Sequence, residues 1–259
     1  MGVTTMNDRI YVLRKKKEDE IEVYDADNYS PQRFITVSSA TKLGLVDISS
    51  CEQYVCLYVA DGPDSCVHRL DLEANDTRWP VNDEPSSLSV NAQRNVLVTC
   101  SVARKIKEFS SYGELLREVG LPLDVVNPQH TVQLSSGSFV VSHGQPGDKV
   151  NRVCTVSEDG HLTVHSHGGQ RGSDTGQYNG PLHLAVDDNE FVFVVDFINR
   201  RVTKLSATLE YEGQVVSPGK LSGSPCRLAF DTARRHLYVA DNEAVEGKWI
   251  LRRVLVFSV

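Results

Sequence analysis

The feature that most constrains this chain is a repeated unit built from short apolar runs. Residues 58–61, Tyr-Val-Ala-Asp, reappear at 238–241, and residues 193–196 carry the looser version Phe-Val-Val-Asp. Similar runs rich in Val, Leu, Ile, Tyr and Phe recur between Gly, Pro, Asp, Asn and Ser, and helical periodicity is almost absent. Short apolar runs bounded by turn residues predict many short strands.

A proline recurs at one phase of this unit, just before an apolar run. It is found at Pro85, Pro128, Pro181 and Pro225, at intervals of about 45 residues. Each unit continues with a second run, a short hairpin and a third run, and most units add a weaker fourth. Four antiparallel strands in about 40–50 residues make one β-propeller blade. Six such units predict an all-β, six-bladed β-propeller of four-stranded antiparallel blades, with residues 1–259 as its single domain.

The two ends of the chain depart from the unit. Only residues 1–8 precede the second strand of the first unit, so we expect the first blade to be incomplete. The sixth unit shows no fourth strand after residues 254–257. A propeller must close to avoid exposed strand edges. Residues 3–5 therefore either pair with an end blade, or the chain is part of a longer protein.

Two of the units resemble the NHL repeat. The resemblance is carried by residues 179–181 (Asn-Gly-Pro), the strand that ends at Asp187, residues 191–196 and residues 199–202 (Asn-Arg-Arg-Val), and residues 225–257 follow the same pattern. It covers nearly the whole chain, strongly in the fifth and sixth units and weakly in the first four. The resemblance implies blades around a central channel, with the innermost strand after the recurrent proline. NHL propellers often end tripartite-motif proteins, where they recruit substrate or RNA for ubiquitin ligation or translational control.

Composition narrows the possible functions and settings. The chain is acidic, with a formal net charge of -7. This disfavours RNA as a partner, because sequence-blind nucleic-acid binding needs a basic surface. No apolar run approaches the roughly 18 residues of a membrane helix, and residues 1–9 show no apolar core of a signal peptide. We expect a monomeric, cytoplasmic propeller that does not bind membranes.

Three polar residues share one phase, two positions after the recurrent proline. They are His130, His183 and Arg227, and the resemblance places this phase near one mouth of the channel. Six-bladed amidating lyases, which resemble NHL propellers, hold a metal in the channel with histidines. Only two of these positions are His here, whereas a catalytic zinc normally has three protein ligands. The preferred interpretation is a polar collar that hydrogen-bonds water and backbone.

Other candidate ligands favour the same conclusion. The six cysteines form no C-x-x-C pair and no zinc-like Cys/His spacing, which predicts buried, reduced thiols. Asp61, Asp196 and Asp241 end their second strands and suggest a carboxylate ring for calcium, but Cys100 and His143 interrupt it. We expect these aspartates to accept backbone N–H groups in the turn that follows. The sequence therefore predicts no metal, no cofactor and no catalytic residue.

The leading hypothesis is a non-enzymatic binding scaffold that presents loops of one propeller face to a protein partner. Through the resemblance, this role extends to recruiting substrate for a ubiquitin ligase. The alternatives are a metal-dependent hydrolase or lyase with its site in the channel, and an RNA-binding NHL domain. An arginine side chain suits such contacts because its planar fork pairs with carboxylate or phosphate. The predicted binding residues are Arg14, His130, His183, Arg200, Arg227 and Arg252.

Overall fold

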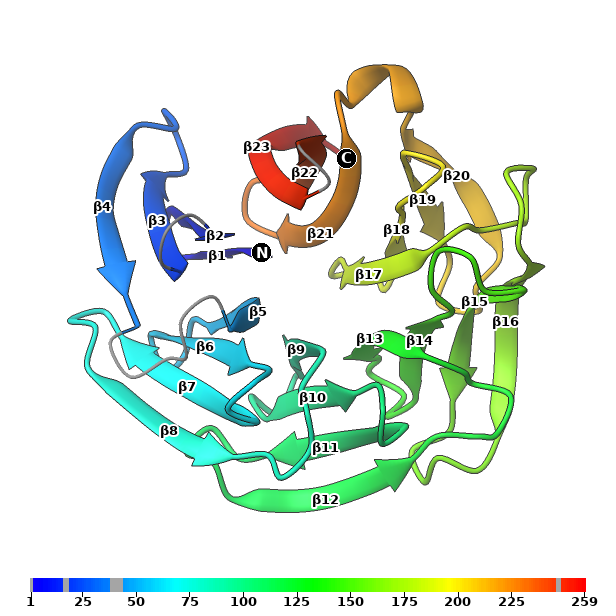
Figure 1. The fold of residues 1–259 in the computed structure, drawn as a ribbon, viewed down its shortest axis with the longest axis horizontal. Helices are drawn as coiled ribbons and strands as arrows, with labels where there is room; N and C mark the ends of the chain where they lie inside the picture. The colour runs from blue at the N-terminus through cyan, green and yellow to red at the C-terminus, as the bar shows by residue number, and fades with distance from the viewer. Residues whose placement is uncertain (1, 16–18, 38–43, 246–247) are drawn as a thin grey trace.

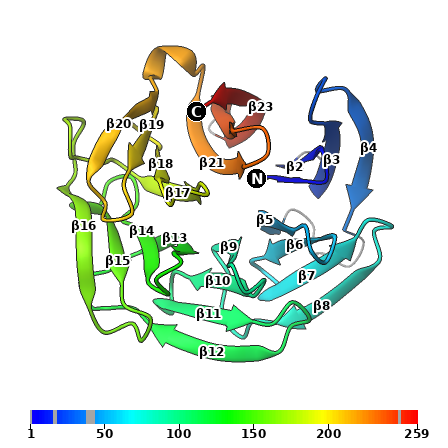
Figure 2. The ribbon, with the colours of Figure 1, turned by 180° about the vertical axis from the view of Figure 1, so that it is seen from behind.

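The computed structural model describes residues 2–15, 19–37, 44–245 and 248–259; for residues 15, 19, 244–245 and 248–252 it describes the backbone alone. Within these ranges, strands β1 to β23 form six antiparallel sheets around a central channel (Figures 1 and 2). A single 3₁₀ turn, Pro218–Lys220, is the one helical element of the same ranges. No helix found there is long and apolar enough to cross a membrane. The predicted six-bladed β-propeller is confirmed.

Each sheet is one blade, and its strands run outward from the channel in chain order. Blades one to three comprise β1 (Gly2–Met6), β2 (Arg9–Lys15), β3 (Asp19–Asp25), β4 (Pro31–Thr36), β5 (Leu45–Cys51), β6 (Cys56–Asp61), β7 (Cys66–Asp71), β8 (Asp76–Pro80), β9 (Ser87–Val90), β10 (Val96–Cys100), β11 (Lys105–Phe109) and β12 (Leu115–Gly120). Blades four to six comprise β13 (Pro128–Gln133), β14 (Phe139–His143), β15 (Val150–Val156), β16 (Thr163–Gln170), β17 (Pro181–Val186), β18 (Val192–Asp196), β19 (Arg201–Leu205), β20 (Tyr211–Val216), β21 (Ser224–Asp231), β22 (His236–Val245) and β23 (Lys248–Ser258).

The second strand of each blade carries the repeat because neighbouring blades cover both of its faces. Every residue of β6 is buried, whereas in the outermost strand β4 Ile35 alone is buried. Tyr11, Tyr58 and Tyr238 occupy equivalent places in three blades, and all are fully buried. Full burial of a large apolar side chain contributes about 1.5–3 kcal/mol. The apolar runs seen in the sequence are therefore the core of the ring.

The first blade has four strands, so the expectation of an incomplete first blade is wrong. Strand β1 pairs antiparallel with β2, from Gly2 opposite Leu13 to Met6 opposite Arg9. An innermost strand of this propeller can be short, since β9 has only four residues. The few residues before the first hairpin therefore suffice for a strand. On its other side, Val3 packs in the apolar cluster of blade six, so β1 closes the ring through its inner strands.

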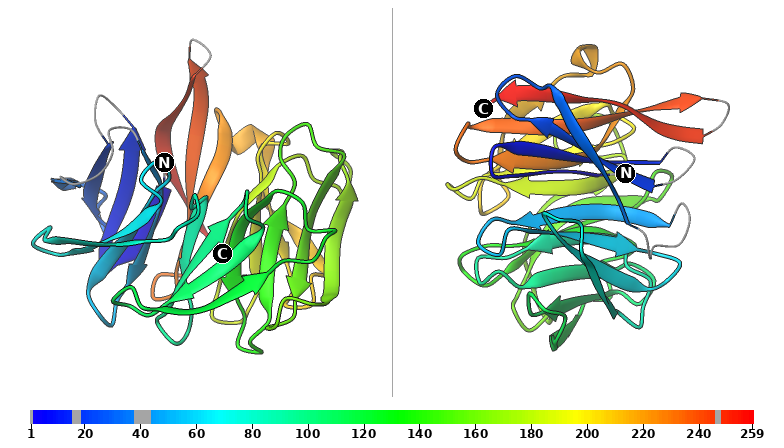
Figure 3. Two further views of the ribbon diagram at one scale, coloured as in Figure 1. Left: turned by 60° about the horizontal axis from the view of Figure 1, so that its bottom comes forward. Right: turned by 90° about the vertical axis from the view of Figure 1, so that its left-hand side faces the viewer.

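Blade six has three strands in the described part of the chain, as the sequence suggested. Its strands β22 and β23 form a long hairpin that extends beyond the neighbouring blades (Figure 3). Contacts between blades six and one are made mainly by β1 against β21 and β22. We call the space between β23 and blade one the seam.

Candidate functional site

Four polar side chains of innermost strands contact one another, and we call them the channel collar because two of them, His130 and His183, line the central cavity. They are Asp47 of β5, His130 of β13, His183 of β17 and Arg227 of β21. In each strand the pairing register shifts at this point, next to the position of the recurrent proline. Such a bulge re-aims a side chain, which explains how side chains from four different blades come into contact. The rings of His130 and His183 lie 3.7 Å apart between centroids.

An ion pair anchors the collar. The Arg227 Nε atom donates to Asp47 Oδ1 at 3.0 Å, and Arg227 Nη2 donates to the Val46 carbonyl at 3.2 Å. The second Asp47 oxygen accepts the Leu88 backbone N–H at 2.9 Å. Burial opposes ionisation of Asp47, but Arg227 and the hydrogen bond from His183 outweigh it and hold its pKa well below the usual value. Asp47 is therefore a carboxylate at neutral pH.

Backbone groups of neighbouring blades form hydrogen bonds with the ring nitrogens of the collar histidines. His130 Nδ1 accepts the Leu184 N–H at 3.3 Å, while Nε2 lies 3.0 Å from the Leu88 carbonyl and donates to it. His183 Nδ1 accepts the Leu228 N–H at 3.3 Å. A neutral imidazole has one donor and one acceptor nitrogen, so this network assigns His130 as neutral with its proton on Nε2. Burial, together with the nearby His183, lowers the pKa of His130 well below its ordinary value.

The collar fits a metal ion poorly, although three of its residues are potential ligands. Asp47, His130 and His183 offer ligand atoms within 4.8 Å of one another. Coordination through His130 Nε2 would break its bond to the Leu88 carbonyl, and the ion would stand beside the Arg227 guanidinium. The geometry thus favours a polar collar that joins the inner strands. The sequence prediction missed Asp47, because Leu45 stands where other blades have proline.

The remaining predicted binding residues lie elsewhere. Arg14 lines the seam and pairs with Glu22. Arg200, in the turn after β18, donates to the Leu221 and Gly223 carbonyls at 2.6 and 2.7 Å and so ties blade five to blade six. The side chain of Arg252 lies outside the described residues. The structure thus brings together His130, His183 and Arg227, while Arg14 and Arg200 stand apart from them.

The recurrent aspartates accept hydrogen bonds from backbone N–H groups, but in two of three blades these groups do not lie in the turn that follows the strand, where we expected them. Asp61 bonds the Asp64 N–H of the following turn at 3.2 Å. Asp196 instead accepts the Asn179 N–H at 2.8 Å, and Asp241 accepts those of residues 222 and 223. In blades five and six these carboxylates therefore fix the segment that connects one blade to the next.

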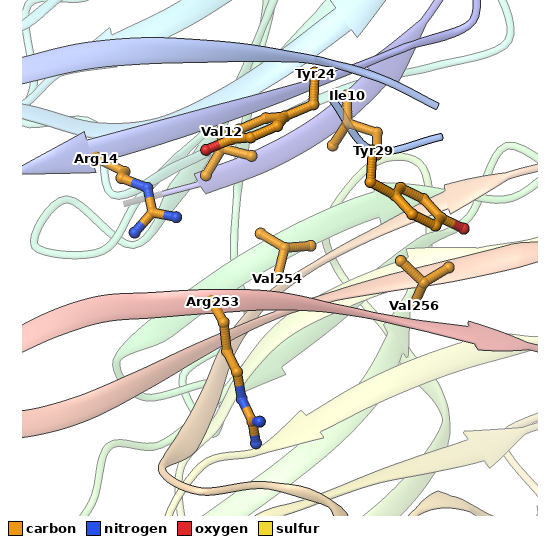
Figure 4. Close-up of a pocket in the computed structure, with 8 residues that line it drawn as sticks. All are labelled: Ile10, Val12, Arg14, Tyr24, Tyr29, Arg253, Val254 and Val256. Carbon is orange, nitrogen blue, oxygen red and sulfur yellow. The ribbon is translucent and has the colours of Figure 1, made fainter. Parts of the chain in front are cut away.

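A cavity of about 350 Å³ opens at the seam, between β2, β3 and β23 (Figure 4). Apolar and aromatic side chains line most of it, with one arginine from each blade: Ile10, Val12, Arg14, Tyr24, Tyr29, Arg253, Val254 and Val256. The Arg253 Nε atom lies 3.2 Å from Asp241 Oδ2, and its side chain is 43% exposed. The missing fourth strand of blade six was the sequence signal for this opening.

No family model matches the chain, and no curated protein matches its sequence. Solved structures share its fold. A protein of unknown function from Bacteroides caccae matches with a TM-score of 0.72 and 12% identity, over 97% of this chain and 90% of that one. A hydrazine synthase from Kuenenia stuttgartiensis matches with a TM-score of 0.68 and 12% identity, over 100% of this chain and 95% of that one. A virginiamycin B lyase from Staphylococcus aureus matches with a TM-score of 0.64 and 11% identity, over 100% of this chain and 83% of that one. At such identities the likeness establishes the β-propeller fold alone.

Proposed function

We propose that this protein is a non-enzymatic binding scaffold whose partner is an extended protein segment that adds to β23. The observation that carries this proposal is the three-stranded sixth blade beside the seam cavity. Five blades have a fourth strand, whereas β23 is the outermost described strand of its sheet. An exposed strand edge is a template for another chain. A segment that pairs with β23 would give blade six the fourth strand that the other five blades have.

The side chains that line the seam cavity also indicate which residues the partner segment should carry. Val254 and Val256 alternate along β23 and face Ile10 and Val12 across the cavity (Figure 4). In strand addition the main chain supplies affinity, and pockets for alternate side chains supply specificity. An apolar residue at every second position of the partner would fill this cavity. Arg253, which is partly exposed, would meet an acidic residue at one end.

The resemblance to NHL propellers supports a wider setting for this role. The bound segment would be a substrate recruited to a ubiquitin ligase, whose chemistry would come from other domains or proteins. RNA is the weaker partner, since the chain has a formal net charge of -7. A monomeric, cytoplasmic protein would be suited to this role.

Peptide selection tests the proposal. Peptides selected from a random display library on the purified protein should carry alternating apolar residues and should slow hydrogen exchange of the β23 amides. Val256→Asp should weaken their binding at least tenfold, because it puts a carboxylate into the apolar seam. Val102→Asp is the matched control, since Val102 is 84% exposed in another blade. Peptides that bind both variants equally would contradict the seam assignment.

A second candidate is a metal-dependent lyase or hydrolase, because three collar residues offer ligand atoms close to one another and a solved lyase has the same fold. Its site would be the group of Asp47, His130 and His183. A tightly bound metal ion that is lost from a His130→Gln, His183→Gln double variant would support this candidate over the scaffold.

A further inference from the structure

Blade two holds a second group of potential metal ligands, outside the channel. Asp61 ends β6, and Cys66 and His68 lie two residues apart on β7. Cys66 Sγ lies 3.5 Å from His68 Nε2, and Asp61 Oδ2 lies 3.7 Å from the same nitrogen. Asp61 and His68 have no exposed surface, and Cys66 is 5% exposed. A thiol, an imidazole and a carboxylate thus converge on one buried point.

The other side of the His68 ring faces a second carboxylate. His68 Nδ1 lies 3.1 Å from both oxygens of Asp76, at the start of β8. This carboxylate accepts a hydrogen bond from the Nδ1–H group and fixes the orientation of the ring. Histidines that ligate metals usually donate their other N–H to a carboxylate or carbonyl in this way. The arrangement therefore turns Nε2 toward Cys66 and Asp61.

Cys66 occupies a place that other blades give to a cation. Asp61 and Cys66 are partners in the register of blade two. In blade five the corresponding pair is Asp196 and Arg201, whose Oδ2 and Nε atoms lie 2.8 Å apart. Blades three to six all have a basic residue at the position of Cys66: Lys105, Arg152, Arg201 and Arg253. Blade two combines the recurrent aspartate with a thiol instead.

We propose that Asp61, Cys66 and His68 bind one zinc ion, with Asp76 as the positioning residue for His68. Tetrahedral zinc, with bonds of about 2.3 Å to sulfur and about 2.0–2.2 Å to nitrogen and oxygen, keeps its ligand atoms roughly 3.3–3.6 Å apart. The distances of 3.5 and 3.7 Å in blade two are close to this spacing. A thiolate ligand favours zinc over magnesium or calcium.

A cavity gives the ion a route from solvent. It measures about 410 Å³ and is lined by Asp64, Cys66, Arg78, Trp79 and Pro80. Arg78 and Asp64 form a partly exposed ion pair in its wall, at 3.3 Å. Cys66 is the ligand on this cavity, so a water molecule entering from it can fill the fourth position of the ion. Three protein ligands and an open position are typical of an accessible zinc site.

Cobalt and zinc titrations of the full chain test this proposal after treatment with a chelator. We expect one Co²⁺ per chain and a thiolate-to-cobalt charge-transfer band in the near ultraviolet, which one equivalent of Zn²⁺ abolishes. Cys66→Ser, which keeps the size of the side chain, should remove the band and weaken zinc binding at least 100-fold. Asp76→Asn should weaken zinc binding by about 10- to 100-fold, as loss of an orienting carboxylate does.

Cys51→Ala is the matched control, because Cys51 is also buried in blade two but is not one of the grouped ligands. It should keep the band, and zinc should raise its melting temperature as it does for the wild type. Two results would overturn the proposal: wild-type protein without the charge-transfer band, or Cys66→Ser that binds zinc as tightly as the wild type. In either case His68 would be a buried link between Asp61 and Asp76 and no metal ligand.

Discussion

The channel collar and the blade two group both combine histidine with carboxylate side chains, yet their histidines have different partners. In the collar, both ring nitrogens of His130 bond the backbone of neighbouring blades, and Arg227 pairs with the carboxylate of Asp47. In blade two, one nitrogen of His68 faces a carboxylate and the other faces a thiol and a second carboxylate. The partners of a histidine, more than its presence, decide whether it can ligate a metal.

The difference follows from where each group lies in the propeller. Collar residues stand on innermost strands, where blades meet, and their hydrogen bonds cross from one blade to the next. The blade two residues stand on β6, β7 and β8 of one sheet, so the register of that sheet alone brings them together. We therefore expect the collar to stabilise the ring and the blade two group to bind zinc.

The largest expected effect is the loss of the collar carboxylate. Asp47→Ala leaves the Arg227 guanidinium and the Leu88 N–H without their buried acceptor. Removing one partner of a buried ion pair costs about 3–5 kcal/mol. Urea unfolding should show a decrease of this size in the free energy of unfolding.

Asp188→Ala is the control for Asp47→Ala. Asp188 pairs with Arg235 at 2.8 Å, but both side chains are more than 40% exposed. Surface pairs contribute about 0–1 kcal/mol. Equal losses in the two variants would show that the collar is not a special source of stability.

The second prediction concerns pH. His130 is surrounded by His183, Asp47 and Arg227, and its pKa in the folded state is well below its ordinary value. The unfolded chain takes up a proton near pH 6.5, which the folded chain does not, so the free energy of unfolding should fall as pH drops below about 6.5. His130 contributes up to about 1.4 kcal/mol per pH unit to this slope.

His130→Gln should therefore reduce the pH dependence of unfolding between pH 7 and pH 5. Burial lowers the pKa of His183 and that of His143, the latter to about 4, so part of the slope should remain. Unfolding by urea at several pH values measures it. A slope unchanged by the substitution would show that His130 takes up its proton at the same pH in the folded and the unfolded chain.

The smallest expected effect comes from giving blade two the arginine of blade five. Cys66→Arg places a guanidinium opposite Asp61, as Arg201 stands opposite Asp196, and the neighbouring cavity of about 410 Å³ has room for it. Because desolvation offsets the attraction within a buried ion pair, the free energy of unfolding of the variant should stay close to that of the metal-free wild type. Its melting temperature should no longer respond to zinc. A rise on adding zinc would mean that the ion binds elsewhere.

The repeat was predictable because burial between neighbouring blades forces apolar residues onto the second strand of each blade. The pairing of β1 with an end blade was one of two alternatives, since Val3, Thr4 and Thr5 form no apolar run and no recurrent proline precedes them. His130, His183 and Arg227 were found through their shared phase, and the same phase counted from Leu45 leads to Asp47. What the phase cannot convey is that backbone groups of neighbouring blades occupy the histidine nitrogens.

The blade two group was missed for a different reason. Its residues have no linear motif, because Asp61, Cys66 and His68 meet through the pairing of β6 with β7. Asp76 joins them only through the pairing of β7 with β8. The seam could be anticipated from the missing fourth strand, but its apolar lining depends on how Tyr24 and Tyr29 approach β23.

X-ray absorption at the zinc edge tests the central claim most directly, because only one of the two groups contains sulfur. Protein loaded with one equivalent of zinc should show one sulfur ligand at about 2.3 Å and nitrogen or oxygen ligands at about 2.0–2.2 Å. This result would place the ion on Cys66 in blade two. A coordination shell of nitrogen and oxygen alone, unchanged in Cys66→Ser, would place it on the collar and contradict the account.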